Sequence, residues 1–407
     1  MKKKLVCFTA SFPFGSKETF FENELPYLAS TFEEVYLFPL YNPSNNSVAR
    51  NVPSNVKFVS PFVSLNKGKR IIQGVFNVSP IGSYLNDFYT EKVFLSKDKF
   101  LRWINSFLNF RTVCTKFSNS IRQYNLTKDE TLLYSYWAEC PLFTTNLCKE
   151  YQKVVRMHGT DFYLPINRGY LPIRQEIYNK SNVLLPISND IQSILKKDYK
   201  IPEEKIHLSR LGISNLEFSW KDFEDKGELN FIRIVSCSRV EKVKRMHLII
   251  EALRMSDSDE QVEWHHFGDG KQFDELQKLV KTLPSHIRVK FHGWSSQKDI
   301  YNFYKNNKIT WFINVSESEG VPVSIMEAMS FGIPCIATDV GGTSEIVNSN
   351  NGHLLPAQFE AAELWREIKN IDLKEHKERR NSAYNTWLNN YEANRNYSNL
   401  TKYLSSL

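Results

Sequence analysis

The sequence predicts an α/β protein that consists of two doubly wound domains. Short apolar runs bounded by polar turns alternate with helix-length segments, which is the pattern of a buried, mostly parallel sheet. This alternation stops near residue 215 and begins again near residue 230, and the residues between are polar, charged and aperiodic. The expected strands lie at residues 5–10, 35–40, 131–137, 154–159 and 183–188 in the first series, and at 232–238, 262–268, 289–293, 309–316 and 334–340 in the second.

The domain boundaries follow from this rhythm. We expect a first domain at residues 1–215, a linker at 216–229 and a second domain at 230–374, followed by a helical segment at 375–407. The chain has 407 residues, of which 42% are hydrophobic, so it can bury two cores in domains of roughly 200 residues each.

Composition excludes several protein classes. No apolar run approaches the roughly 18 to 20 residues that span a bilayer, and the apolar segment after the basic N-terminus is too short for a secretory signal. The six cysteines include no Cys-x-x-Cys pair, so we expect free thiols in a reducing compartment and no zinc site. These features predict a cytoplasmic protein.

Basic residues gather in the first half of the chain. Residues 1–215 carry 28 Lys and Arg against 18 Asp and Glu, whereas residues 216–407 carry 24 against 27. This excess of positive charge suits an anionic lipid surface or a phosphate-bearing substrate, and a solvated Lys-rich surface without a partner is the alternative. We expect no nucleic-acid partner.

Residues 92–124 interleave large apolar and basic side chains, which is typical of basic amphipathic helices. Such helices can lie in a membrane interface, or they can pack as a pair on a sheet, and the sequence leaves both interpretations open. The residues concerned are Phe94, Leu101, Trp103, Phe107 and Phe110, among Lys97, Lys99, Arg102, Arg111 and Lys116.

Residues 309–332 predict a ligand site. They read as a buried strand, a SESEG loop at its carboxyl end and a short helix with Pro322 in the first turn. Ligands of open α/β sheets bind at this edge, where helix N-termini offer N–H groups to anions, so the loop is a candidate diphosphate site. Glu327 is costly in so apolar a helix unless it is hydrogen-bonded, for example by a pair of ligand hydroxyls. The alternative is that Glu319 caps the helix and Glu327 faces solvent.

This span resembles the C-terminal signature of the family 4 glycosyltransferases, which are retaining enzymes of the GT-B fold. The matching residues are Ser316, Glu319, Gly320, Glu327, Ala328, Met329, Gly332, Ile333, Pro334, Gly341, Gly342 and Glu345. The resemblance implies two Rossmann-like domains that face each other across a cleft, and a C-terminal helix that crosses back to the first domain.

The same resemblance implies roles for residues of the second domain. Glu319 would be catalytic and approach the donor sugar, Glu327 would hold the ribose hydroxyls of the donor, and Trp294 would lie on the nucleobase side. The backbone that would face the sugar and the phosphates belongs to Gly320, Val321, Pro322 and Val323.

The stretch RIVSCSRVEKVKR resembles the family's diphosphate-binding turn and places Arg239 and Lys244 on the departing nucleoside diphosphate. Fixed cations there would stabilise the charge of the leaving group, so no metal is required. A solvated basic turn is the alternative. The family has glycine where this chain has Ser238 and Arg245.

The N-terminal stretch FTASFPFGSKETF is similar to the opening of family members that build bacterial surface polysaccharides. The resemblance implies that Gly15 and Ser16 approach the donor phosphates. Lys17 and Glu18 would then lie close to the acceptor.

The stretch VVRMHGTDFY resembles the His-Gly-x-Asp turn that the family places after a strand of its first domain. His158 would contact the donor sugar near the reaction centre and is a catalytic candidate. Asp161 would fix the turn or contact the acceptor. Trp137 could line an acceptor pocket, and simple packing is the alternative.

The resulting expectation is a retaining, metal-independent glycosyltransferase. It would move a sugar from a UDP or GDP sugar, without any other cofactor, to a hydroxyl of a glycan or polyprenyl-linked acceptor in surface polysaccharide synthesis. It would be cytoplasmic, with peripheral contact to the anionic inner face of the membrane through its basic first domain. Two alternatives stay open: an epimerase-like sugar-nucleotide enzyme, and an inactive sugar-nucleotide-binding subunit, which Ser238, Arg245 and Leu211 motivate.

Overall fold

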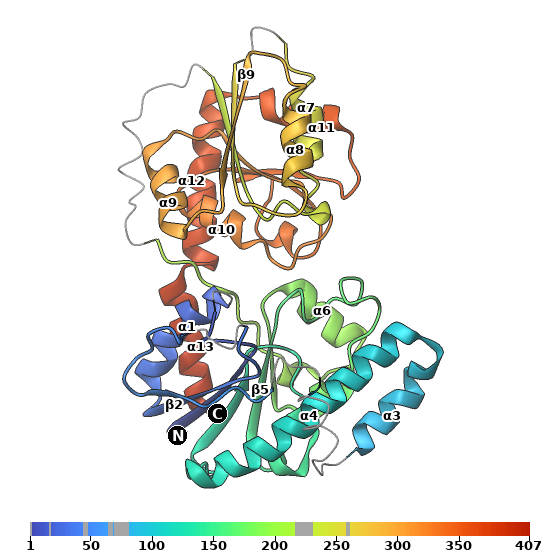
Figure 1. Ribbon diagram of the computed structural model, residues 1–407. Helices are drawn as coiled ribbons and strands as arrows, with labels where there is room; N and C mark the ends of the chain where they lie inside the picture. Colours follow the sequence, from blue (N-terminus) through green and yellow to red (C-terminus); the bar gives the residue numbers. More distant parts are fainter. Residues whose placement is uncertain are drawn as a thin grey trace. The chain divides into compact units, whose positions relative to one another are not determined.

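The computed structural model divides the chain into two compact units (Figure 1). The first unit contains Met1–Gly212 and Ala393–Leu407, and the second contains Ile213–Glu392. The structure describes residues 2–15, 18–43, 48–63, 68, 81–215, 231–257 and 261–407. The predicted linker at 216–229 lies outside these residues.

The first unit is built on a parallel six-stranded sheet with the order β3-β2-β1-β4-β5-β6. The chain starts in the middle of the sheet and winds outward in both directions, which confirms the doubly wound arrangement. The strands are nearly continuous apolar runs because helices cover both faces. Their bounds are β1 (Lys4–Thr9), β2 (Glu34–Pro39), β3 (Val56–Phe58), β4 (Thr131–Ser135), β5 (Gln152–Met157) and β6 (Val183–Pro186).

Alternate residues of β1 show which helix covers each face of this sheet. Leu5 and Cys7 belong to the core that packs against α1 (Thr19–Thr31) and α13 (Ala393–Ser406). Phe8 points to the opposite face, where its ring lies 5.4 Å from that of Phe117 on α4 (Lys97–Gln123). The other helical elements are α3 (Gly82–Thr90), η1 (Val93–Leu95), η2 (Pro141–Thr144), η3 (Asn146–Cys148), α5 (Arg174–Lys180), α6 (Asn189–Lys197) and η4 (Glu203–Lys205).

The amphipathic segment at 92–124 therefore packs on the sheet. Phe110, Cys114 and Phe117 of α4 are buried, so this face packs as the packing interpretation predicted, but residues 97–123 form one long helix rather than a helix pair. Among the described residues, no helix combines the length and the apolar character that crossing a membrane requires.

The second unit repeats the doubly wound plan around its own parallel sheet, with the order β12-β11-β10-β7-β8-β9. Its strands are β7 (Ile232–Cys237), β8 (Val262–Phe267), β9 (Ile287–Gly293), β10 (Trp311–Asn314), β11 (Cys335–Thr338) and β12 (Gly352–Leu355). Its helices are η6 (Lys242–Lys244), α7 (His247–Leu253), α8 (Phe273–Val280), α9 (Gln297–Asn306), α10 (Val323–Ser330), η7 (Thr343–Glu345), α11 (Ala361–Lys369) and α12 (Leu373–Asn390).

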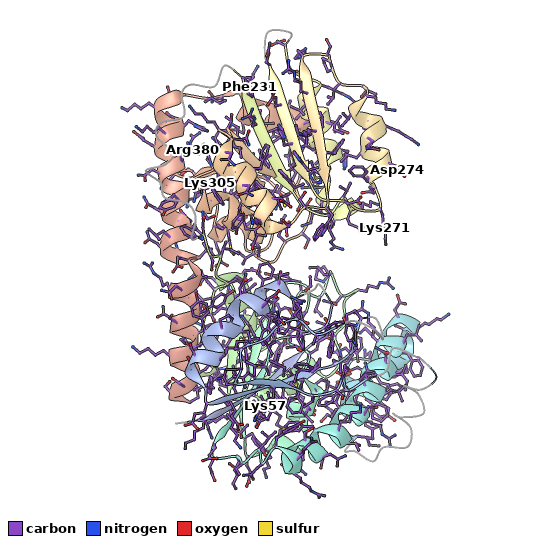
Figure 2. The ribbon with its side chains drawn as sticks, turned by 60° about the vertical axis from the view of Figure 1, so that its left-hand side comes forward. Lys57, Phe231, Lys271, Asp274, Lys305 and Arg380 are labelled. Carbon is purple, nitrogen blue, oxygen red and sulfur yellow. The ribbon has the colours of Figure 1, made fainter. Side chains whose placement is uncertain are left out.

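The C-terminal boundary differs from the prediction. The sequence predicted that residues 375–407 pack on the first unit, but α12 belongs to the second unit and only α13 joins the first. Arg380 of α12, labelled in Figure 2, donates to the carbonyl of Ile309, and Trp387 donates to the carbonyl of Ile213. The polar sequence of α12 concealed these buried contacts, because each is made by one long side chain rather than by an apolar stripe.

Candidate functional site

An ion pair joins two loops at the carboxyl edge of the second unit's sheet. Lys244, in the turn after β7, places its Nζ 2.6 Å from Oε1 of Glu319, in the loop after β10. Asn314 Nδ2, at the end of β10, donates to the same oxygen at 3.1 Å. The two charged side chains are only 18% and 14% exposed. The structure thus brings together the predicted diphosphate cation and the predicted catalytic acid.

Arg245 anchors the turn that presents Lys244. Its backbone adopts the left-handed conformation (φ 47°), which costs a non-glycine residue about 1–3 kcal/mol and explains why glycine is usual there. Three hydrogen bonds offset this cost, because the guanidinium donates to the carbonyls of Val315, Ser316 and Ala357 at 2.8, 3.2 and 2.9 Å. Arginine at this position therefore ties the turn to the Glu319 loop.

Arg239 is exposed after the end of β7, and its side chain has no hydrogen bond or ion pair with the described residues. The turn after β7 passes close to Gly268, which directly follows the neighbouring strand β8. A Cβ on Gly268 would lie 1.8 Å from the carbonyl oxygen of Ser238, so the glycine at 268 allows the two backbones to approach. Serine in place of glycine at 238 is compatible with this geometry.

Glu327 is half-buried on α10, so it is not the fully solvated side chain of the alternative interpretation. Burial raises the pKa of Glu327 to about 7, although hydrogen bonds from Gln297 and Tyr301 oppose the shift. The Gln297 Nε2 donates to Oε1 at 2.7 Å. Burial, and then the nearby Glu327 carboxylate, raise the pKa of Cys237 at the end of β7 to about 12. Gln297 is the first residue of α9, which follows β9, so its hydrogen bond places Glu327 at the same carboxyl edge of the sheet as the Lys244 turn.

The start of α10 offers free backbone donors beside this ion pair. The N–H groups of Gly320, Val321 and Val323 have no hydrogen-bond partner among the described residues. Pro322 supplies no N–H, so its part is to begin the helix rather than to donate. A Cβ on Gly341 would lie 2.0 Å from the carbonyl oxygen of Glu319, so only glycine lets this turn support the loop.

Trp294 follows β9 and is 80% exposed. Its predicted place beside a nucleobase stays a prediction. The part of the chain that the structure describes contains no group of three or more His, Cys, Asp and Glu side chains that could hold a metal ion. All six cysteines are free thiols, as predicted.

In the first unit, His158 lies at the carboxyl edge of the sheet, directly after β5. It is buried between aromatic rings, 4.7 Å from Tyr136 and 4.8 Å from Trp137 between centroids. Asp161 fixes the turn, because its two oxygens accept from the backbone N–H groups of His158 and Ala138, both at 2.7 Å. Neither ring nitrogen of His158 has a hydrogen-bond partner among the described residues. Both nitrogens are buried, and Nδ1 lies 3.7 Å from Oδ2 of Asp161, so the predicted contact of His158 with a donor sugar stays a prediction.

A buried ion pair holds the strand that carries His158. Arg156 NH1 of β5 lies 2.5 Å from Oε2 of Glu24 on α1, and both side chains are fully enclosed. The hydroxyl of Tyr134 donates to the other oxygen of Glu24 at 2.8 Å. Breaking such a pair would leave a buried charge without a partner, so the pair fixes α1 against the strand ends.

Glu18 holds the loop after β1 and the ring of Trp137. Its carboxylate accepts hydrogen bonds from the backbone N–H groups of Ala10, Ser11 and Phe12 at 2.7 to 2.9 Å, and from the Ser11 hydroxyl at 3.1 Å. It also accepts from Nε1 of Trp137 at 2.7 Å. The structure thus gives Glu18 a positioning role, and its predicted contact with an acceptor stays a prediction.

The predicted glycine loop is only partly described. Gly15 has a positive φ of 73°, and its carbonyl accepts from Arg50 at 2.8 Å. Ser16 and Lys17 lie outside the described residues.

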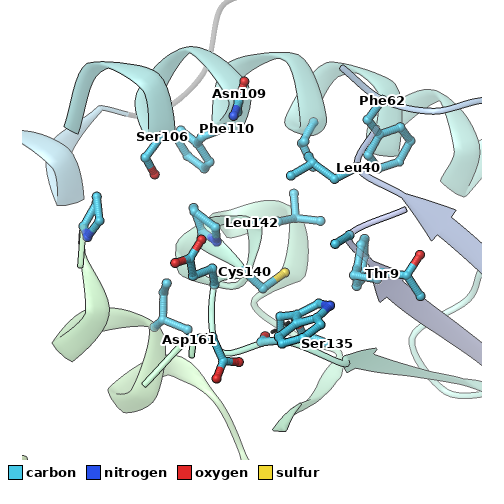
Figure 3. Close-up of a pocket in the computed structure, with 18 of the residues that line it drawn as sticks. Thr9, Leu40, Phe62, Ser106, Asn109, Phe110, Ser135, Cys140, Leu142 and Asp161 are labelled. Carbon is cyan, nitrogen blue, oxygen red and sulfur yellow. Dashed lines mark hydrogen bonds between the residues drawn. The ribbon is translucent and has the colours of Figure 1, made fainter. Parts of the chain in front are cut away.

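A cavity of about 490 Å³ opens beside this cluster (Figure 3). Trp137 and Asp161 line it, and the predicted role of Trp137 toward an acceptor stays a prediction. The sequence prediction missed the wall formed by α4. The available signal was the set of polar residues at helical spacing along one face of this amphipathic helix. These residues are Arg102, Asn105, Ser106 and Asn109.

A protein-family model matches the part of the chain that carries the Lys244–Glu319 ion pair. Residues 218–386, which include Lys244, Glu319 and Glu327, match the family described as Glycosyl transferases group 1.

The matched residues make up less than half of the chain.

A curated relative aligns with about half of the chain. The chain is 28% identical over 206 residues to WcaL of Escherichia coli, a glycosyltransferase assigned to colanic acid biosynthesis. That alignment covers 49% of this chain and 50% of WcaL, and the chain spans about half the length of the curated relatives it matches.

Solved structures match the fold of the whole chain. The lipopolysaccharide outer core galactosyltransferase WaaB has a TM-score of 0.70 at 18% identity, with complete coverage of both chains. Anabaena HepE in complex with UDP has a TM-score of 0.65 at 17% identity, also with complete coverage. The predicted GT-B fold class is confirmed.

The hydrogen bonds of Glu18 lead to a prediction about stability. In Glu18→Gln, an amide NH₂ would replace an oxygen that accepts from backbone N–H groups, and donors would face one another. We expect urea denaturation to show a loss of about 2–4 kcal/mol in the free energy of unfolding. Glu33→Gln is the control, because Glu33 is 68% exposed and 3.8 Å from Lys3, and it should change the value by less than about 0.5 kcal/mol. Equal stability of both variants would contradict the positioning role.

Proposed function

We propose that the chain is a retaining glycosyltransferase of bacterial surface polysaccharide synthesis. It transfers a sugar from a nucleotide-diphosphate sugar to a hydroxyl of a glycan or lipid-linked acceptor. The observation that carries the proposal is the Lys244–Glu319 ion pair beside free N–H groups at the start of α10, within the residues that match the family described as Glycosyl transferases group 1. The likeness of the chain to WcaL and to the fold of WaaB supports it.

The charges fit the departure of a nucleoside diphosphate. Negative charge grows on the leaving group as the bond to the sugar breaks, and fixed cations and N–H groups stabilise that charge where water is excluded. Lys244 is held in place by Glu319, and Arg239 is free to reach a ligand. The N–H groups at the start of α10 add the positive end of a helix dipole. The proposal therefore assigns no metal and no cofactor besides the donor.

The remaining donor contacts follow from the other polar groups. Glu327 accepts hydrogen bonds from the two ribose hydroxyls when it is ionised, and the exposed ring of Trp294 lies on the nucleobase side. His158 hydrogen-bonds a hydroxyl of the donor sugar through a ring nitrogen that has no partner among the described residues. Retention is consistent with a site in which Glu319 is paired with Lys244 and no separate nucleophile is assigned. Between UDP and GDP sugars we prefer a UDP sugar as the donor, since HepE has the same fold and its structure contains UDP.

A membrane contact is the second part of the proposal. Large apolar side chains are exposed on α3, η1 and the start of α4, and the exposed Lys92 and Lys97 lie among them. Apolar side chains can insert between lipids while lysines stay with anionic headgroups. The exposed apolar residues are Leu85, Tyr89, Phe94, Leu95, Phe100 and Leu101. The enzyme would then act at the inner face of a bacterial membrane, where lipid-linked acceptors are available.

Replacing Lys244 should remove transition-state stabilisation. We expect Lys244→Met to lower kcat by about 100- to 1000-fold in sugar transfer or donor hydrolysis, measured with the best donor from a screen of UDP and GDP sugars. Lys242→Met is the matched control, because Lys242 is exposed in the same turn. Wild-type turnover in Lys244→Met would refute the assignment. Product analysis with and without an acceptor separates transfer from epimerisation, since an epimerase releases a modified sugar nucleotide in both cases.

Donor affinity should depend on pH through Glu327. Its pKa of about 7 means that the carboxylate ionises as pH rises from 6 to 8, and only the ionised form accepts from both ribose hydroxyls. The dissociation constant of UDP-glucose should therefore fall by about tenfold over this range, by linkage. Calorimetry can measure it, and the diphosphate diester of this probe does not titrate there. Glu327→Gln should bind weakly with a flat profile, and a pH dependence retained in that variant would exclude Glu327 as its source.

Membrane binding should depend on the exposed apolar side chains. Leu95 is 71% exposed, and we expect Leu95→Glu to reduce partition onto phosphatidylglycerol-containing vesicles by at least about tenfold in flotation assays. Met255→Glu changes a residue of the second unit that is 49% exposed, and it should bind like wild type. Wild type that stays in solution at low salt with every vesicle composition would remove the membrane part of the proposal.

A further inference from the structure

The wall that α4 gives to the cavity changes from polar to apolar along the helix. Six residues of α4 line the cavity at helical spacing, so they lie on one face. In chain order the first four are polar and the last two are apolar, over a length of about 16 Å along the axis. They are Arg102, Asn105, Ser106, Asn109, Phe110 and Val113.

Polar groups of the opposite walls gather at the Arg102 end, although Leu171, Pro172 and Ile177 also line the cavity and Thr9 lies on the same side as Leu40. At the Arg102 end, the side chain of Arg102 donates to Asn167 at 3.4 Å, and Asn167 donates to the carbonyl of Thr160 at 2.8 Å. The Thr160 loop carries Asp161, so carboxylate and carbonyl groups gather at this end together with the nearby Glu139, which also lines the cavity.

Aromatic side chains close the other end. Lys116, one turn after Val113, donates to the carbonyl of Pro61 at 3.0 Å and so holds the neighbouring Phe62 beside this part of α4. The ring of Phe62 lies 5.4 Å from that of Phe38, which in turn lies 5.7 Å from Phe8. Figure 3 shows Leu40 and Phe62 together at one end of the view and Ser106 toward the other.

We propose that this cavity binds the hydrocarbon chain of an amphiphilic acceptor at its aromatic end and the acceptor's polar head at its Arg102 end. A saccharide alone would place hydroxyls against Phe38, Phe62 and Leu40, whose side chains can return no hydrogen bonds, and that burial is costly. A chain attached to a head group matches both ends. The acceptor role of the ligand rests on the proposed function, whereas the binding of an apolar chain does not.

One further observation supports this occupant. The outer surface of the α3–α4 region carries the exposed apolar residues of the proposed membrane contact, so the helix that would touch lipid is also the helix that forms the cavity wall.

The test compares alkyl glucosides that differ only in chain length. Calorimetry would measure binding of methyl, butyl, hexyl and octyl β-glucoside to the full chain, below the concentration at which octyl glucoside forms micelles. We expect affinity to rise with every added methylene, by up to roughly fourfold each when the group is fully buried. Affinity that is independent of chain length would overturn the proposal. Farnesyl phosphate against dodecyl phosphate then tells a branched isoprenoid chain from a linear one.

Variants locate the binding. Val113→Phe fills the aromatic end from α4, and Leu40→Phe fills it from the loop after β2, so that the result does not depend on one variant folding. Each should lower the affinity for octyl glucoside at least tenfold and leave that for methyl glucoside unchanged. Thr115→Phe adds the same ring on the exposed face of α4 and should bind octyl glucoside like wild type. Equal octyl glucoside binding in all three variants would place the chain elsewhere and overturn the proposal.

The outcome is separable from that of the proposed function. Chain-length-dependent binding without sugar transfer from any nucleotide sugar would leave the hydrocarbon site standing and refute the enzymatic proposal. Sugar transfer to a water-soluble saccharide, together with alkyl glucoside affinities that do not depend on chain length, would support the enzymatic proposal and refute the hydrocarbon site.

Discussion

The ion pair between Lys244 and Glu319 depends on a constraint that governs the whole second unit: parallel strands all end at the same edge of their sheet. Residues that are 75 positions apart in the sequence meet there because β7 and β10 are neighbours in the strand order. The guanidinium of Arg245 fastens one turn to the other, and Gly341 allows a third turn to support the Glu319 loop. The free N–H groups at the start of α10 have a defined direction only because this set of turns is fixed.

Much of this arrangement could be predicted from the sequence. The alternation of apolar runs predicted both sheets, and the resemblance to the family 4 glycosyltransferases predicted that Lys244 and Glu319 share a site. The apparent departures, Ser238 and Arg245, proved to be compatible with the geometry. Their compensating contacts come from Gly268 and from carbonyls distant in the sequence, and a local motif does not reveal contacts of that kind.

The features that the sequence did not predict depend on long-range contacts. The polar α12 was predicted to leave the second unit, but single buried side chains such as Arg380 hold it there. The cavity was missed because no local pattern connects the polar residues of α4 with Phe38 and Phe62, which come from distant parts of the sequence. Glu18 was predicted to bind an acceptor, and its five hydrogen bonds to Trp137 and the loop after β1 became visible only in the fold.

The placement of α13 has a consequence for how the protein is made. Tyr397, Leu400 and Leu404 belong to the same core as Leu5 and Leu28, so the first unit encloses its sheet with the last residues of the chain. A ribosome therefore synthesises the entire second unit as an insertion, between Gly212 and Ala393, before it supplies the helix that the first unit still lacks. During translation the second unit can fold while the nascent first unit still exposes the apolar face that α13 later covers.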